Sequence, residues 1–309
     1  MARYHRRLLI KQLSVLFMML GVLLLPRIVT SQLPNNPREG WAVLLEMDDY
    51  PGTNSDLPTG FSDVQKWIST LLVLGWQTHH IQIYQDSLTQ SVGEAALHFL
   101  AQNADANDVV LFYIFAHGNW ILNEMHWENW FSSGWLNLAS QEKVLVVSAC
   151  GSEAMINPVR TDSAGHVHLA SSQVGEYSWA GLPEEGLPII GDVFNHFLTN
   201  AFQNASADAD DDGEVVVEEA FAFATPLTRE YISSVVFPAF PYYAVMSNHT
   251  APIPVIDDAY PEDMSLQVEP GGPPVGYWLV LPPELLLILS VVMYCVIIIL
   301  IGLFIRRRR

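Results

Sequence analysis

Residues 109–118 read VVLFYIFAHG and residues 143–151 read KVLVVSACG, and these two stretches decide the fold. Each apolar run is long enough to form a strand that is buried on both faces, as the strands of a parallel sheet are. The first run ends on His117 and the second on Cys150. Functional groups of an open parallel sheet collect where the strands end, beyond their carboxyl edge. The sequence therefore predicts that His117 and Cys150 share one site.

Cys150 is a candidate nucleophile, because the chain offers it no partner for a disulfide in the same domain. The chain has 2 cysteines, and the other, Cys295, falls in a predicted membrane segment. A thiolate attacks carbonyl carbons, and an imidazole such as His117 protonates a departing amine. Glycine beside each residue lets the backbone N–H groups of Gly118 and Cys150 approach a developing oxyanion. Two alternatives stay open, a buried structural thiol at Cys150 and a core histidine at His117.

Outward from these runs, apolar strands alternate with helical patterns along residues 38–250. This alternation predicts one α/β domain of three layers, with a mainly parallel sheet and right-handed crossovers. The expected strands cover residues 41–47, 78–84, 109–116, 144–149, 167–171 and 242–246, and the expected helices cover residues 64–74, 91–103, 190–203 and 217–233.

Both ends of the chain have the composition of membrane-targeting segments. Residues 1–31 begin with basic residues and continue into an apolar stretch, which is typical of a secretory signal peptide or an uncleaved signal anchor. Residues 285–305 are uncharged and long enough to cross a bilayer as a helix. The four arginines at 306–309 predict a cytoplasmic tail. We therefore expect a single-pass membrane protein whose main domain lies outside the cytoplasm.

A proline-rich segment, residues 251–277, separates the domain from the predicted membrane helix. It has prolines at positions 252, 254, 261, 270, 273 and 274. Proline at this density excludes a helix or a central strand, so we expect a semi-rigid stalk.

Acidic residues dominate the exterior part of the chain. All 33 of them lie within residues 39–284. The basic residues of the predicted exterior part, residues 32–284, are Arg38, Lys66, Lys143, Arg160 and Arg229. The negative electrostatic field of these residues repels phosphates, which argues against a nucleic-acid partner. The same field attracts cations and basic peptides. The alternative for most of these carboxylates is a solvated acidic surface.

Residues 208–219, DADDDGEVVVEE, match the loop with which helix–loop–helix proteins bind calcium. Gly213 permits the sharp turn that this loop requires. The predicted ligands are the carboxylates of Asp208, Asp210, Asp212 and Glu219 and the backbone carbonyl of Glu214. The pattern therefore predicts a Ca²⁺ cofactor, and the alternative is a solvent-exposed acidic turn.

The chain resembles the caspase-like cysteine peptidases, which include legumains, metacaspases, clostripain-like enzymes and the glycosylphosphatidylinositol transamidase catalytic subunit. The matching pieces are His117-Gly118 and Ala149-Cys150 after apolar strands, in that order, and the segment DDYPGTNSDLPTGFSDV at residues 48–64. Legumain-type and metacaspase-like members are the nearest branch. The resemblance implies a caspase-hemoglobinase fold and a Cys–His dyad.

The same resemblance implies that Asp63 receives a basic side chain of the substrate before the cleaved bond. The chain departs from the metacaspase-like pattern at Gly60, where a cysteine is usual, and at Ser148, where an aspartate is usual. Asp49 and Ser172 follow predicted strands and are expected to border the same cleft. The alternative for Asp63 is a cap at the start of the helix that follows it.

The leading hypothesis is a membrane-anchored exterior cysteine endopeptidase with peptide or protein substrates. Two alternatives stay open. One is a transamidase of the glycosylphosphatidylinositol-transamidase type, which passes the acyl group to an amine. The other is an inactive calcium-binding surface receptor built on a peptidase fold.

Overall fold

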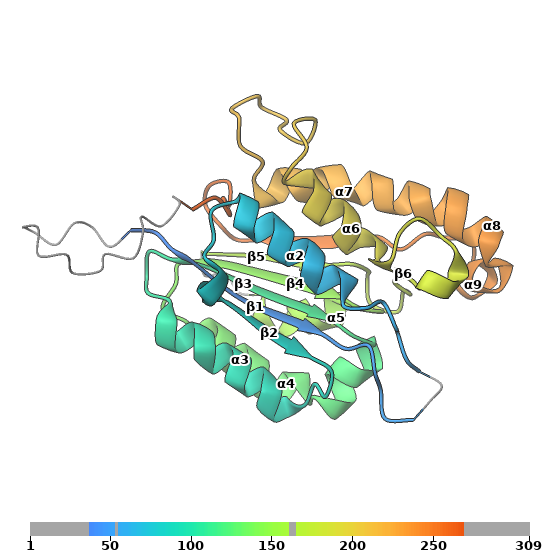
Figure 1. The fold of residues 1–309 in the computed structure, drawn as a ribbon, viewed down its shortest axis with the longest axis horizontal. Helices are drawn as coiled ribbons and strands as arrows, with labels where there is room; N and C mark the ends of the chain where they lie inside the picture. Colours follow the sequence, from blue (N-terminus) through green and yellow to red (C-terminus); the bar gives the residue numbers. More distant parts are fainter. Residues whose placement is uncertain (1–36, 53–54, 161–164, 269–309) are drawn as a thin grey trace, which may run out of the picture. The chain divides into compact units, whose positions relative to one another are not determined.

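A six-stranded sheet forms the centre of the molecule (Figure 1). The computed structural model describes residues 37–52, 55–160 and 165–268. In these residues the strand order is β2-β1-β3-β4-β5-β8. The strands are β1 (Gly40–Glu46), β2 (Ile81–Gln85), β3 (Val109–Phe115), β4 (Glu142–Ser148), β5 (His166–Ala170) and β8 (Val255–Asp258). β1 to β5 pair in parallel, and β8 pairs antiparallel with β5 at the edge.

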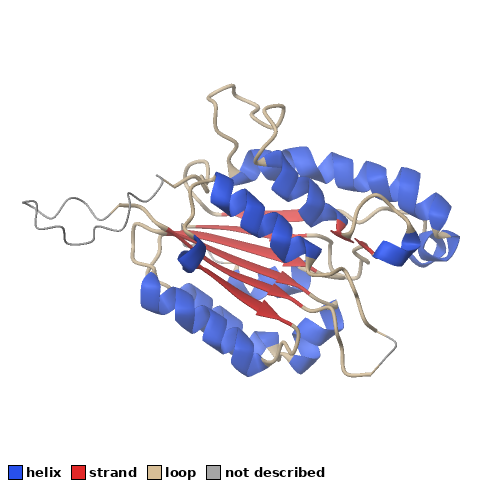
Figure 2. Cartoon of the chain, in the orientation of Figure 1, coloured by secondary structure: helices blue, strands red, loops and turns tan. Residues whose placement is uncertain are grey.

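Helices cover both faces of this sheet (Figure 2), so the expected three-layer α/β fold with a mainly parallel sheet is confirmed. One face carries α3 (Gln90–Asn103), α4 (Trp127–Leu136) and the short α5 (Glu153–Ile156). The other face carries α2 (Ser62–Val73), α6 (Val193–Ala201) and α7 (Val217–Tyr231).

The remaining elements are short. They are η1 (Thr78–His80), η2 (Trp120–Glu124), η3 (Asn157–Val159), η4 (Pro183–Glu185), η5 (Ile232–Val236), α8 (Phe237–Ala239) and α9 (Pro241–Met246). A two-stranded antiparallel sheet is formed by β6 (Ala180–Gly181) and β7 (Gly191–Asp192).

The central strand β3 shows why the runs of apolar residues become strands. All seven of its residues are buried. Successive side chains point to opposite faces of a sheet. Phe112 accordingly packs among the aromatic side chains of α4, whereas Tyr113 packs against Trp67 of α2. Each face of β3 therefore has a helical layer to cover it.

Residues 242–246, which were expected to form a strand, form helix α9 instead. Pro241 occupies the first turn, where a missing N–H costs no hydrogen bond. Tyr243 and Ala244 are buried, whereas Tyr242, Val245 and Met246 are exposed. A run of five apolar residues does not distinguish a short strand from a short helix.

The expected stalk is wrong for residues 251–268, which belong to the domain. Val255–Asp258 form the edge strand β8, between prolines that an edge strand tolerates. The chain then returns across the molecule and buries Met264, Leu266 and Val268 with the side chains of α2 and α7. Residues 269–277 lie outside the described residues.

The predicted signal segment 1–31, the membrane helix 285–305 and the basic tail 306–309 also lie outside the described residues. In the part of the chain that the structure describes, every helix is too short or too polar to span a bilayer.

Candidate active site

His117 and Cys150 lie at the same edge of the sheet because of the register between β3 and β4. Phe115 pairs with Ser148, and the two candidate residues each follow two positions later. Both side chains line one cavity of about 270 Å³ beyond the carboxyl ends of the strands. The apolar part of its lining includes Leu57, Trp179 and Tyr243.

The Cys150 thiol is half-buried in this cavity. Its Sγ lies 3.8 Å from the carbonyl oxygen of Ser178. Burial raises the pKa of the Cys150 thiol, and the negative charge of Asp192 adds to that rise. The resting thiol is therefore protonated at neutral pH and needs a base before it can attack.

The His117 imidazole is oriented by the loop between β1 and α2. Its Nε2 lies 2.8 Å from the carbonyl oxygen of Ser55. A carbonyl only accepts hydrogen bonds, so Nε2 carries the hydrogen and Nδ1 holds the free lone pair. The backbone N–H of His117 donates to the Tyr50 hydroxyl at 2.7 Å, and the two rings lie 4.7 Å apart. His117 is thus held in the tautomer that accepts a proton at Nδ1.

Gly118 brings the two strand ends into direct contact. A Cβ atom at position 118 would lie 2.1 Å from the carbonyl oxygen of Cys150. No side chain fits there without a shift of backbone. This close approach places the Gly118 and Cys150 main chains beside the same cavity.

Asp63 does not line this cavity and is fully buried beneath it. Its carboxylate accepts hydrogen bonds from the backbone N–H of Asp192 at 2.8 Å and from Asn195 Nδ2 at 2.9 Å. Lys66 Nζ lies 2.8 Å from the same carboxylate. Asp63 does not cap α2 either, since the carboxylate that accepts from the first turn of α2 is that of Glu46. The structure therefore gives Asp63 a structural position.

Asp192 and Glu185 are the carboxylates that line the cavity. Asp192 caps α6 by accepting the backbone N–H of Asn195 at 2.8 Å, and it accepts the Ser178 hydroxyl at 2.7 Å. Burial, reinforced by the charge of Asp63, raises the pKa of Asp192 to about 7. The sequence analysis placed Asp192 inside the expected helix 190–203, whereas in the structure it is the N-cap before Val193.

The chain is similar to the solved structure of caspase-1 from Spodoptera frugiperda, with a TM-score of 0.51 and 13% sequence identity. The match covers 77% of this chain and 93% of that chain. The fold is caspase-like. No protein-family model and no curated protein sequence matches the chain.

Asp49 and Ser172, the other two residues predicted to contact the substrate, lie outside the cavity. Asp49 is exposed and borders a neighbouring groove. Ser172 is fully buried, and its hydroxyl donates to the carbonyl oxygen of Ala149 at 2.9 Å. Ser172 therefore supports the backbone that carries Cys150.

The predicted calcium loop brings together three of its four predicted carboxylate ligands. Carboxylate oxygens of Asp208, Asp210 and Glu219 lie within 4.8 Å of one another. Gly213 has φ +93°, which suits the sharp turn. Asp212 instead accepts the backbone N–H of Glu214 at 2.8 Å. The converging carboxylate oxygens of Asp208, Asp210 and Glu219 are hard ligands, and their spacing fits Ca²⁺.

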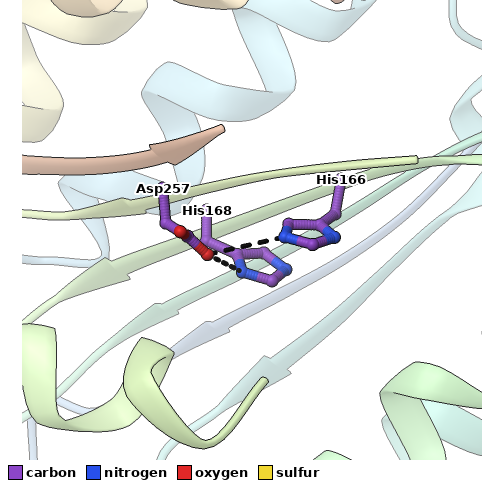
Figure 3. Close-up of side chains that lie close together, drawn as sticks. All are labelled: His166, His168 and Asp257. Carbon is purple, nitrogen blue, oxygen red and sulfur yellow. Dashed lines mark ion pairs between the residues drawn. The ribbon is translucent and has the colours of Figure 1, made fainter. Parts of the chain in front are cut away.

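A second cluster joins β5 to β8, where His166, His168 and Asp257 converge (Figure 3). His168 Nδ1 and His166 Nε2 lie 3.3 Å and 3.5 Å from Asp257 Oδ2. Trp135 Nε1–H, which only donates, lies 3.0 Å from His168 Nε2. Nε2 is therefore the acceptor, and Nδ1 carries the hydrogen of the neutral ring. A metal ion at Nδ1 would displace that hydrogen, so the cluster suits an imidazole–carboxylate contact better than a metal ion.

Proposed function

We propose that this chain is a cysteine endopeptidase in which Cys150 is the nucleophile and His117 the proton carrier. The observation that carries the proposal is the placement of both side chains on one cavity, with His117 Nε2 committed to the Ser55 carbonyl. The caspase-like fold supports it, because it puts the two strand ends side by side.

The reaction follows from these positions. His117 Nδ1 takes the proton of the Cys150 thiol, and the thiolate attacks the carbonyl carbon of the scissile bond. The backbone N–H groups of Gly118 and Cys150 donate to the oxyanion that forms. The protonated His117 then gives its proton to the leaving amine, which breaks the C–N bond. Water, deprotonated by His117, releases the acyl group and restores the thiol.

We further propose that a lysine or arginine side chain precedes the scissile bond. Asp192 and Glu185 contribute carboxylates to the cavity, and its described lining contains no lysine or arginine. A basic substrate side chain would compensate the buried Asp192 charge through a charge-assisted hydrogen bond. This assignment transfers the expected role of Asp63 to Asp192.

The proposal also includes a bound calcium ion and a membrane anchor. The convergence of Asp208, Asp210 and Glu219 supports a bound Ca²⁺ that would neutralise their mutual repulsion. The composition of residues 285–305 supports a single membrane helix that tethers the domain outside the cytoplasm.

Covalent labelling tests the proposal. We expect a peptide electrophile ending in arginine to label the purified wild-type domain at Cys150, as read by mass spectrometry. The same probe ending in aspartate should label it more slowly, and a Cys150→Ala variant should stay unlabelled. A wild-type protein that reacts with neither probe would contradict the assignment of the nucleophile. Products that carry an added amine, from assays with excess amine, would indicate a transamidase.

A further inference from the structure

A groove of about 560 Å³ adjoins the candidate active site on its His117 side. It lies between the ends of β1 and β2 and helix η2, and its lining includes Tyr50, Trp120, Asp49 and Glu124. Tyr50 forms the wall between this groove and His117, since its hydroxyl accepts the His117 backbone N–H at 2.7 Å. Tyr50, which lines the groove, therefore contacts His117, which lines the catalytic cavity.

The position of His117 defines which part of a substrate would reach this groove. In the proposed reaction His117 protonates the leaving amine, so the residues after the scissile bond depart on the His117 side. The side chain before the bond faces Asp192 in the catalytic cavity. The groove behind Tyr50 is a concave surface on this side of His117.

The chemistry of the groove favours a cationic side chain. Asp49 and Glu124 are exposed at its border, and the part of the chain that the structure describes places no lysine, arginine or histidine in its lining. The indole of Trp120 is half-buried and stands edge-on to Tyr50 at 5.2 Å. An aromatic wall beside two carboxylates binds a lysine or arginine through both charge and cation–π contact.

We propose that this groove binds the leaving segment of the substrate and prefers basic residues within the first three positions after the scissile bond. This inference rests on the proposed peptidase function. It also gives Asp49 the substrate contact that its place after β1 predicted, but in the groove and not in the catalytic cavity.

The test compares three substrates that are identical before the scissile bond. The first carries only a fluorescent amine after the bond, and the other two continue for three residues that contain either lysines or glutamates. We expect the wild type to cleave the lysine-extended peptide about fivefold faster in kcat/KM than the glutamate-extended one, as two partly solvated ion pairs allow. The double variant Asp49→Asn with Glu124→Gln should reduce this ratio to about one.

Glu94→Gln is the matched control, because Glu94 is an exposed carboxylate of α3 that lines a different depression. It should keep the wild-type ratio. Equal cleavage of the two extended peptides by the wild type, or a ratio that the double variant leaves intact, would overturn the inference. Failure of the peptidase proposal itself is recognised separately, because the wild type would then not cleave the short fluorescent substrate.

Discussion

The tautomer of His117 decides what the Cys150–His117 pair can do. The Ser55 carbonyl holds the Nε2 hydrogen, so in the proposed reaction Nδ1 would exchange the proton with substrate and thiol. Burial raises the pKa of the Cys150 thiol, so the thiolate forms only when His117 accepts the proton.

Removal of this proton carrier should cost most of the activity. His117→Ala should lower kcat/KM by about 10²- to 10⁴-fold, since both thiol deprotonation and amine protonation lose their catalyst. The melting temperature should change little, because the imidazole is only partly buried. His98→Ala, at an exposed position on α3, serves as the control. Wild-type kcat/KM in the His117 variant would remove His117 from the mechanism.

Asp192 should make the binding of basic substrates depend on pH near neutrality. Its pKa of about 7 means that the carboxylate is mostly protonated at pH 6 and mostly ionised at pH 8. The KM for an arginine substrate should therefore fall as the pH rises through 7, while the KM for its uncharged glutamine analogue stays flat. Asp192→Asn should raise the arginine KM by at least about tenfold and flatten the profile.

Glu184 supplies the control for this measurement, because it is exposed and does not line the cavity. Glu184→Gln should keep the wild-type profile. A steep profile that survives in Asp192→Asn would assign the titration to another group.

Among single residues, the sequence predicted that His117 and Cys150 lie at one edge of the sheet, but not that Asp192 lines their cavity. His117 and Cys150 were predictable, because each ends an apolar strand and strand register is a local property of the sheet. Asp63 and Asp192 are both buried aspartates near helix starts, and only tertiary packing places Asp192 at the cavity and Asp63 away from it. The hydrophobic periodicity of the sequence does not distinguish these two aspartates.

Among the elements, the predicted calcium loop connects α6 to α7, and three of its carboxylates come together only in the folded chain. Linkage predicts that Ca²⁺ at a hundred times its dissociation constant adds about 2.7 kcal/mol to the free energy of unfolding. Chelation should therefore lower the melting temperature. Glu219→Gln should reduce the response to Ca²⁺, because it removes a carboxylate charge from the converging group.

Asp211→Asn is the matched control, since Asp211 lies in the same loop but outside the converging group. Asparagine also tolerates the left-handed backbone at this position, where φ is +63°. The control should respond to Ca²⁺ as the wild type does. Identical melting curves of the wild type in chelator and in millimolar Ca²⁺ would leave the loop as a solvated turn.

The sequence predicted helices and strands correctly where the hydrophobic pattern was long. The prediction failed where the pattern was short. Strand β3, with 7 residues, and helix α3, with 14, have long patterns, and the sequence predicted both. The segment 251–268 reads as a proline-rich linker, yet four proline-free residues within it complete the sheet edge. Pairing partners far away in sequence decide such a strand, and composition does not report them.

For the molecule as a whole, the contact between β5 and β8 should make stability depend on pH. His166 and His168 are buried on β5, and burial lowers the pKa of both imidazoles, that of His168 to about 4. Asp257 on β8 faces both rings and favours their charged forms, with Asp258 contributing at His166. Lys143 on β4 opposes protonation, and Arg160 pairs with Asp257 from the loop before β5.

The sign of the effect follows from these lowered pKa values. An unfolded histidine has a pKa of about 6.5, so below that pH the unfolded chain binds protons that the folded chain does not. The free energy of unfolding should therefore fall as the pH drops from about 6.5 toward 4. The lowering of the His168 pKa to about 4 corresponds to a loss of about 3 kcal/mol in the free energy of unfolding by pH 4. One pKa unit is worth about 1.4 kcal/mol.

Urea unfolding between pH 4.5 and 7.5 measures this effect, and hydrogen exchange corrected for intrinsic rates locates it. We expect the amides of Val255–Asp258 to lose protection first on acidification, because β8 pairs with β5 at the sheet edge and its opening would let the two buried histidines bind protons. His168→Gln should flatten the pH dependence, since glutamine does not titrate and can still accept the Trp135 N–H. His196→Gln removes another histidine of lowered pKa, on α6, and should leave the protection of β8 as in the wild type. Equal acid sensitivity of β8 in the wild type and in His168→Gln would show that His168 does not control the edge of the sheet.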